Sequence, residues 1–337
     1  MGSRRLLRAP SAIIGGIALI STMLVTGGPA QAKAKPINIA YMSFAVANSY
    51  DAPMLAAARA TAASLGAKIT VFDAGNDPAK QYSQMQNAIA TGKYKGIITQ
   101  PIFGTALIPL VKKAIAKHIR VVNIDQILGA KFTTARPQVK GLSANVTFLP
   151  SRIGKQLGEQ VIAACASKNL NPCNVGYIYS IKGTTLDVAI NKGFQSAIAG
   201  TPSIKIVAEG QSYFTPSIAL GAVQNMLQAN PDLSLVVGSD QGIEGAIQAL
   251  DGAKKTGQVL LVGFGGSAAA IAGVKAGTWF SDVAQAPASE GQLGVAALIK
   301  AIKTGKSSGS INPVASLPDR GVITKANVSK FTAEWPG

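Results

Sequence analysis

Short runs rich in β-branched and other apolar residues alternate along the chain with longer, alanine-rich amphipathic stretches, beginning at Pro36. In the first half we expect strands at 37–42, 68–73, 95–99 and 119–125. We expect helices over about 50–65, from Asp77-Pro78 onward, and up to Lys117. Strands that alternate with helices in this way predict βαβ units, and therefore a parallel sheet with helices on both faces.

After an irregular stretch between Gln126 and Asn145, the same alternation restarts. It predicts strands at 174–179, 204–209, 233–238, 258–264 and 279–284, and helices at about 151–167, 185–199, 216–229, up to 250, and 288–302. Thr215-Pro216, like Asp77-Pro78, places a capping residue before a proline in the first helical turn. Two runs of one pattern predict an α/β fold of two doubly wound lobes with parallel sheets.

The first 32 residues have the pattern of a cleaved export signal. A charged region at Arg4, Arg5 and Arg8 precedes an apolar stretch from 12 to 25, and Ala30-Gln31-Ala32 supplies a small-x-small cleavage site. An uncleaved membrane anchor is the alternative, although the apolar stretch is shorter than the ~20 residues of a comfortable span. No cysteine follows it for lipid attachment, so we expect a periplasmic or cell-envelope protein without a lipid anchor. Ser3-Arg4-Arg5 leaves open whether export follows the general or the twin-arginine route.

Composition and charge exclude some classes of protein. Apolar residues make up 47% of the 337 residues and charged residues 14%, which excludes a disordered chain. The formal net charge is +17, but the lysines and arginines are scattered near the ends of predicted helices. A nucleic-acid-binding protein would gather them on one element, so we expect no nucleic-acid partner.

Cys165 and Cys173 are the only cysteines, eight residues apart around a loop that contains Asn171-Pro172. In an oxidising compartment such a pair favours one local disulfide, with two free buried thiols as the alternative. The single histidine, His118, lies far away in sequence. We therefore expect no metal site.

Polar and aromatic residues follow the predicted strands. In open parallel sheets ligands bind beyond the carboxyl ends of the strands, so these residues are the candidate site. Carboxylates and amides exchange hydrogen bonds with adjacent hydroxyl groups, while aromatic rings cover the C–H faces of a sugar. The expected ligand-binding residues are Phe44, Asn48, Tyr50, Gln100, Asp125, Gln126, Thr185, Asp187, Phe214, Asp240 and Gln285.

A series of short motifs gives these positions a family context. They read N-S-Y (48–50), D-P-A-K-Q (77–81), K-G-I-I-T-Q-P (95–101), V-V-N-I-D (121–125), G-T-T (183–185), K-G-F (192–194), N-P-D (230–232), V-G-F (262–264) and A-Q-A-P (284–287). In this order and spacing, the chain resembles the type I periplasmic solute-binding proteins of ABC importers, especially their ribose-binding branch, over nearly all of the sequence after the leader.

The resemblance implies two Rossmann-like lobes joined by three hinge strands. It assigns residues 33–140 plus 286–315 to the N-terminal lobe and residues 141–285 plus 316–332 to the C-terminal lobe. It further implies that Tyr50 and Phe214 sandwich the ligand, that Asp125 accepts hydrogen bonds from hydroxyls, and that Gln285 lies where the chain crosses between lobes.

Five positions depart from the family pattern. Gln126 and Val188 stand where arginines would grip a sugar, Gly265 replaces an aspartate, Ser239 an asparagine, and Asp51 a second ring. Losing two guanidinium groups and a carboxylate removes the strongest bidentate contacts, so the resemblance favours a differently shaped sugar, a polyol or a less hydroxylated compound over ribose.

Other functions fit less well. The glycine-rich segment 262–268, with Asp282 about twenty residues later, resembles a dinucleotide-binding turn but lacks the full set of glycines. A secreted hydrolase remains an alternative, although no G-x-S-x-G elbow accompanies His118. A sugar-responsive repressor would carry a helix-turn-helix where this chain has a leader.

We therefore expect a monomeric solute-binding protein, without cofactor and without enzymatic activity. It would deliver a sugar or polyol to an ABC permease in the inner membrane. A non-sugar ligand, and a chemoreceptor or sensor as partner, remain open alternatives.

Overall fold

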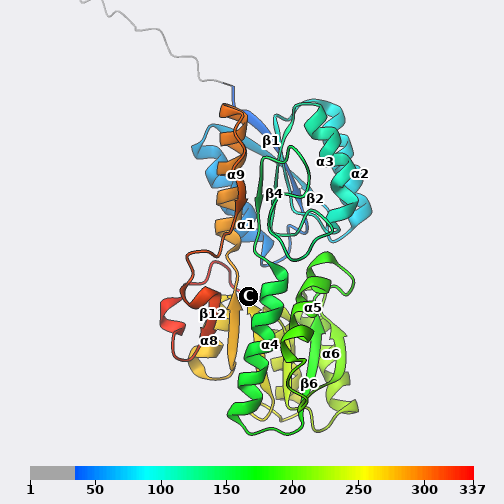
Figure 1. Ribbon diagram of the computed structural model, residues 1–337, viewed down its shortest axis with the longest axis vertical. Coiled ribbons are helices and arrows are strands. Elements are labelled where there is room, and N and C mark those ends of the chain that lie inside the picture. The colour runs from blue at the N-terminus through cyan, green and yellow to red at the C-terminus, as the bar shows by residue number, and fades with distance from the viewer. Residues whose placement is uncertain (1–34) are drawn as a thin grey trace, which may run out of the picture. The chain divides into compact units, whose positions relative to one another are not determined.

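The computed structural model describes residues 35–337, so the expected signal peptide lies outside the described residues. Two α/β units follow, each built on a six-stranded sheet, and we call them the first and the second lobe. The first lobe contains β1 (Ile37–Ser43), α1 (Asp51–Ser64), β2 (Ala67–Asp73), α2 (Pro78–Thr91), β3 (Gly96–Thr99), α3 (Gly104–Ala116), β4 (Arg120–Ile124), β5 (Ala144–Val146), α9 (Pro287–Thr304) and β11 (Gly309–Ile311). Helices α1 and α9 cover one face of its sheet, and α2 and α3 cover the other (Figure 1).

The second lobe has the same layered construction. It contains α4 (Pro150–Ser167), β6 (Cys173–Tyr179), α5 (Thr185–Ile198), β7 (Ile204–Gln211), α6 (Pro216–Ala229), β8 (Leu235–Ser239), α7 (Asp240–Gly252), β9 (Leu260–Gly265), α8 (Ala268–Ala276), β10 (Ser281–Ala284), β12 (Val322–Thr324) and the 3-10 turns η1 (Pro318–Gly321) and η2 (Val328–Lys330). The expected fold of two doubly wound lobes is confirmed.

The strand orders are β11-β5-β4-β3-β1-β2 in the first lobe and β12-β10-β9-β8-β6-β7 in the second. Only the β10–β12 pairing is antiparallel among the strand pairs of residues 35–337. The chain crosses between the sheets after β5, after β10 and after β11. One expected boundary needs correction, because β5 pairs with β4 of the first lobe through Val122↔Ala144 to Ile124↔Val146. The first crossing therefore follows Val146 and does not lie at residues 140/141.

The two expected helix caps behave differently. The Asp77 carboxylate accepts hydrogen bonds from the backbone N–H groups of Ala79 (2.8 Å) and Lys80 (3.1 Å), as the sequence predicts. Thr215 also precedes its helix, but its hydroxyl donates to the carbonyl of Tyr213 (3.0 Å) and caps no helical N–H group. The start of α6 therefore relies on the fixed φ of Pro216.

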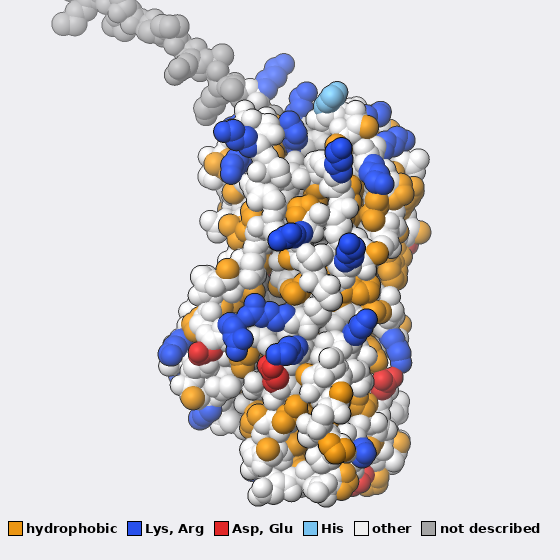
Figure 2. Space-filling model, in the orientation of Figure 1, with side chains coloured by type: hydrophobic (Ala, Val, Ile, Leu, Met, Phe, Trp, Pro, Cys, Tyr) orange, Lys and Arg blue, Asp and Glu red, His pale blue; other side chains and the backbone are white. Residues whose placement is uncertain are grey.

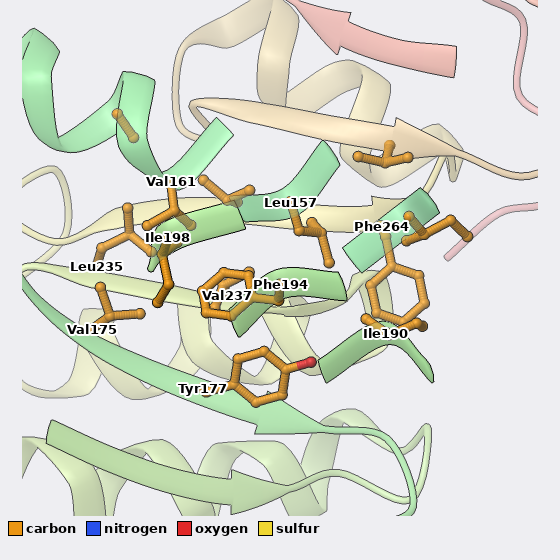
Figure 3. Close-up of a cluster of buried hydrophobic side chains, with 14 of the residues drawn as sticks. Leu157, Val161, Val175, Tyr177, Ile190, Phe194, Ile198, Leu235, Val237 and Phe264 are labelled. Atoms are coloured by element: carbon orange, nitrogen blue, oxygen red, sulfur yellow. The ribbon is translucent and has the colours of Figure 1, made fainter. Parts of the chain in front are cut away.

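Apolar side chains fill the space between each sheet face and its helices. On one face of the second sheet, α4 and α5 pack against the strands (Figure 3). Rings from both layers meet there, because Tyr177 of β6 lies 5.1 Å from Phe194 of α5, centroid to centroid. The side chains that interdigitate in this layer include Leu157, Val161, Val175, Tyr177, Ile190, Phe194, Ile198, Leu235, Val237 and Phe264.

Two further features concern the outside of the molecule. Lys and Arg side chains are spread over the visible face of both lobes, and they do not form a single basic stripe (Figure 2). Within residues 35–337 the structure contains no helix of the length and apolarity that a membrane span requires.

Cys165, near the end of α4, and Cys173, the first residue of β6, form a disulfide with an S–S distance of 2.06 Å. The bond joins the helix to the amino end of the strand that follows it. It therefore lies at the opposite end of β6 from the strand-end residues expected to bind ligand.

Replacing both cysteines, Cys165→Ala with Cys173→Ala, should lower the free energy of unfolding by about 2–3 kcal/mol, the entropy that a short disulfide loop removes from the unfolded chain. Denaturant titration of the oxidised protein and the double variant measures this difference. An unchanged midpoint would show that the bond does not contribute to stability.

Candidate functional site

A cavity lies where the carboxyl ends of the strands of both lobes meet. Its empty space, with the open solvent of its mouth included, is about 450 Å³. Its walls are formed by Phe44, Asn48, Tyr50, Asp51, Gln100, Asp125, Gln126, Leu186, Phe214, Ser239, Gln241, Phe264, Gln285 and Trp335.

Most residues expected from the strand ends line this cavity, and three do not. Those present in the wall are Phe44, Asn48, Tyr50, Gln100, Asp125, Gln126, Phe214 and Gln285. Thr185, Asp187 and Asp240 are buried but do not contribute to the wall. The wall also contains Asp51 and Ser239, two of the positions that depart from the family pattern, and four residues that were not expected there, namely Leu186, Gln241, Phe264 and Trp335.

Gln100 connects the two carboxylates of the cavity. Its side-chain Nε2 donates to Asp51 Oδ1 at 2.6 Å and to Asp125 Oδ2 at 2.9 Å. Its Oε1 accepts from the backbone N–H of Phe44 at 3.1 Å, and its backbone carbonyl accepts from Gln81 Nε2 at 2.8 Å. These contacts determine which end of the Gln100 amide carries the donors, so both N–H bonds point at carboxylates.

Asp125 occupies a backbone conformation that aspartate tolerates better than most residues, with φ of +60° directly after β4. Its N–H donates to the carbonyl of Val146 (2.9 Å), and its own carbonyl accepts from the hydroxyl of Thr147. Its Oδ2 accepts from Gln100 and from Gln126 Nε2 (3.0 Å), whereas no described residue donates to Oδ1. One carboxylate oxygen therefore remains for a ligand.

Burial is the main cause of the pKa shifts among the carboxyl groups of this wall. It raises the pKa of Asp51 from 3.8 to about 7 and that of Asp125 to about 6, while the hydrogen bonds from Gln100 act in the opposite direction. Glu290 of α9 lies behind Tyr50, fully buried, and a hydrogen bond from the Tyr50 hydroxyl acts to lower its pKa. Burial and then the charge of Asp125 hold the pKa of Glu290 well above its usual range.

Aromatic rings form much of the remaining cavity wall. Phe44, after β1, and Phe214, after β7, come from different lobes and meet edge to face with their centroids 6.4 Å apart. Phe214 has φ of +52°, an uncommon conformation for an aromatic residue, which turns its ring toward the cavity. Tyr50 meets Trp335 edge to face at 5.3 Å.

Trp335 is the residue that sequence reasoning missed most clearly. Its Nε1 donates to the carbonyl of Gly265 at 2.8 Å. A Cβ on Gly265 would lie 2.6 Å from the Trp335 ring and 2.6 Å from Asp240 Oδ2, so the indole occupies the space that a side chain at 265 would need. The tail lies outside the repeating strand–helix pattern, and only the apolar character of a late tryptophan signals its burial.

Asp187 and Asp240 have other partners, which explains their absence from the wall. Asp187 accepts from the backbone N–H groups of Ser180 (3.1 Å) and Ile181, and so holds the turn after β6. Asp240 Oδ2 accepts from Ser267 N–H at 2.8 Å. Their role in binding stays a prediction, as does that of Thr185, the first residue of α5.

The glycine-rich segment after β9 is a structural turn. Ser267 caps the start of α8, because its hydroxyl accepts from Ala270 N–H at 3.0 Å. Asp282, the acid considered for a ribose hydroxyl, is fully buried and accepts from Gly266 N–H at 2.8 Å. Within residues 35–337, the structure contains no group of three or more His, Cys, Asp or Glu side chains arranged for a metal ion.

Comparison with known proteins identifies this architecture. Residues 39–307 match the family described as the periplasmic binding protein domain, over most of the chain. The chain belongs to the periplasmic binding protein family. Solute-binding proteins make up this family, and the resemblance inferred from the motifs is confirmed.

Several relatives of this periplasmic binding protein are import proteins. It is 27% identical to the ribose import binding protein of Salmonella typhimurium over 292 residues, 86% of this chain and 91% of that protein. It is 29% identical to the D-allose-binding periplasmic protein of Escherichia coli over 260 residues, 73% and 78% of the two chains.

Among solved structures, it is similar to an ABC transporter solute-binding protein from Bacillus halodurans with bound myo-inositol. The TM-score is 0.77 at 20% identity, with 90% of this chain and 100% of that chain covered. A solute-binding protein from Mycobacterium smegmatis with bound glycerol gives 0.76 at 23% identity, covering 90% and 99%. At these identities the likeness shows the fold.

The raised pKa values predict how stability depends on pH. Asp51 and Asp125 hold their protons more tightly in the folded than in the unfolded chain, so the free energy of unfolding should fall as pH rises from about 4 to about 7. Asp125→Asn should make this decrease shallower, while Asp251→Asn, at an exposed position outside the cavity, should leave it as it is. Denaturant titrations across this pH range measure both slopes, and equal slopes in the two variants would contradict the assignment.

Proposed function

We propose that this periplasmic binding protein captures a sugar or polyol in its cavity and delivers it, chemically unchanged, to the permease of an ABC importer. The observation that carries the proposal is the set of free hydrogen-bonding groups in the wall. Asp125 Oδ1 and the side-chain amide nitrogens of Asn48, Gln241 and Gln285 have no hydrogen-bond partner among the described residues. Acceptors and donors set among rings suit a compact ligand with several hydroxyl groups.

Capture follows from the way both lobes contribute to the wall. A ligand that touches Asp125 from the first lobe and Phe214 from the second gains all its contacts only when the lobes are close together. Such a ligand favours the closed state by its differential affinity, and the three crossings act as the hinge. The closed form then docks on the permease and releases the solute.

The cellular setting belongs to the same proposal. The Salmonella and Escherichia coli relatives carry names of import and periplasmic binding proteins, which supports export of this chain to a periplasm-like space. We propose that it acts there as a monomer, without cofactor and without catalysis.

A thermal-shift screen of the leaderless protein against sugars and polyols tests the proposal. A ligand at 100 times its dissociation constant should add about 2.7 kcal/mol of stability and so raise the melting temperature. The ligand should then be recovered intact. Conversion into a product would point to an enzyme, and a response only to non-hydroxylated compounds would contradict the sugar or polyol assignment.

Asp125→Asn should weaken binding of whichever solute the screen finds by about 10- to 100-fold, because a hydrogen bond to a charged group contributes roughly 1.5–3 kcal/mol. Calorimetric titration measures the loss. Asp251→Asn is the matched control for removing one negative charge, and an equal loss in both variants would mean that Asp125 lies outside the site.

Phe214→Ala should weaken binding of the same solute by on the order of tenfold, because the ring no longer contacts the C–H face of the solute. The neighbouring Tyr213→Ala is the control, since Tyr213 is 42% exposed and does not line the cavity. If the two substitutions have the same effect, the ring of Phe214 does not contact the solute.

A further inference from the structure

The cavity wall contains two buried carboxyl groups side by side. Asp51 is 5% and Asp125 3% exposed, and both accept from the single side-chain amide of Gln100. Their other donors are also neutral, namely the backbone N–H of Ala45 for Asp51 and the Gln126 amide for Asp125. Hydrogen bonds from neutral amides lessen the cost of a buried charge but do not neutralise it.

Within residues 35–337, no cationic side chain forms an ion pair with these two groups. None of the described residues that line the cavity is Lys, Arg or His. The two ion pairs found within residues 35–337, Lys155–Glu159 and Lys182–Glu209, involve other carboxylates. The exterior, by contrast, is rich in lysine and arginine (Figure 2), so a shortage of basic residues in the chain does not explain the acidic interior.

More acidic groups lie behind the wall. Glu290 is fully buried, and Glu334, Asp51 and Asp125 all act on it electrostatically. On the side of the second lobe, Asp240 and Asp282 form a fully buried pair. Burial raises the pKa values of these carboxyl groups, so they hold protons when no cation is nearby, and a cation placed among them would favour their ionised, negatively charged forms.

An unpartnered oxygen atom and aromatic rings complete this surface. Asp125 Oδ1 accepts from no described residue, whereas the hydroxyl of Tyr50, itself only 9% exposed, interacts with the Glu290 carboxyl group behind the wall. Five rings line the same small space, from Phe44, Tyr50, Phe214, Phe264 and Trp335. The face of an aromatic ring attracts cations, and the attraction strengthens where water is excluded.

We propose that the solute of this protein carries a protonated amine on its hydroxylated skeleton, so that the ligand class is an amino sugar or an amino polyol. The proposal rests on the proposed function and narrows it. An ammonium group beside Asp125 Oδ1 would supply the positive charge that the wall lacks, and the amides and rings would hold the rest of the molecule. A neutral sugar would leave these carboxyl groups to be neutralised by protons alone, and an anionic ligand would disfavour their ionised forms.

Calorimetric titrations with matched pairs test this directly. The pairs are D-galactose with D-galactosamine, D-glucose with D-glucosamine, and scyllo-inositol with scyllo-inosamine, at about pH 7, where most of the amine is protonated. N-acetyl-D-galactosamine and N-acetyl-D-glucosamine serve as neutral controls at the same ring position. We expect at least one aminated compound to bind about tenfold or more tightly than its hydroxyl partner, a difference of about 1.4 kcal/mol.

Variants of Gln126 separate charge from shape. Gln126→Lys places an ammonium group beside Asp125 and should abolish or invert the preference for the aminated compound. Gln126→Met removes the same amide without adding charge, and should keep the sign of the preference even if both affinities fall. An identical preference in the Lys variant and the wild type would overturn the proposal.

The outcomes also distinguish this inference from the function on which it rests. If every hydroxyl compound binds as tightly as its aminated partner, or more tightly, the inference fails while the proposed sugar or polyol capture stands. If neither series binds and the thermal-shift screen of sugars and polyols shows no response, both fail together.

Discussion

The site depends on one side-chain amide. Gln100, at the end of β3, holds Asp51 at the start of α1 and Asp125 at the end of β4, and its own position is held by Gln81 and by the backbone of Phe44. Without its two N–H donors, two buried carboxylates would face each other with fewer hydrogen bonds, and both would favour their protonated forms. Three strand ends and one helix start are thus organised around a single group, and the polarity of the cavity follows from it.

Much of the fold could be predicted because it depends on periodic patterns. The alternation of apolar strands and amphipathic helices is strong along most of the chain, and Asp77-Pro78 marks a helix start by local chemistry alone. The short strand β5 escaped prediction because three residues in an irregular stretch carry no period, and only pairing with β4 makes them a strand. The same holds for β11 and β12, also three residues each, which form where the chain crosses between the sheets.

Part of the site could be predicted from the rule that ligands bind beyond the carboxyl ends of parallel strands. That rule located Gln100, Asp125 and Phe214 in the cavity wall. Asp240 also follows a strand, but its carboxylate accepts from Ser267 N–H and does not line the cavity, a contact across 27 residues that the rule does not describe; its role in binding stays a prediction. Trp335 comes from a tail that belongs to neither series of repeats, and its place beside Gly265 follows from packing that no local pattern encodes.

The segments of the first lobe are not contiguous in the sequence, and this affects how the chain folds. Helix α9 and strand β11 belong to the first lobe, but they are synthesised after the strand–helix series of the second. Gly96 of β3 packs against Leu298, and Gly291 lies against the backbone of Met54, contacts that span more than two hundred residues. Until such segments emerge, one face of the first sheet lacks part of its cover and exposes apolar surface. A chain built in this way completes the native contacts of its first lobe only after most of the sequence has been synthesised, so this lobe reaches its final packing late.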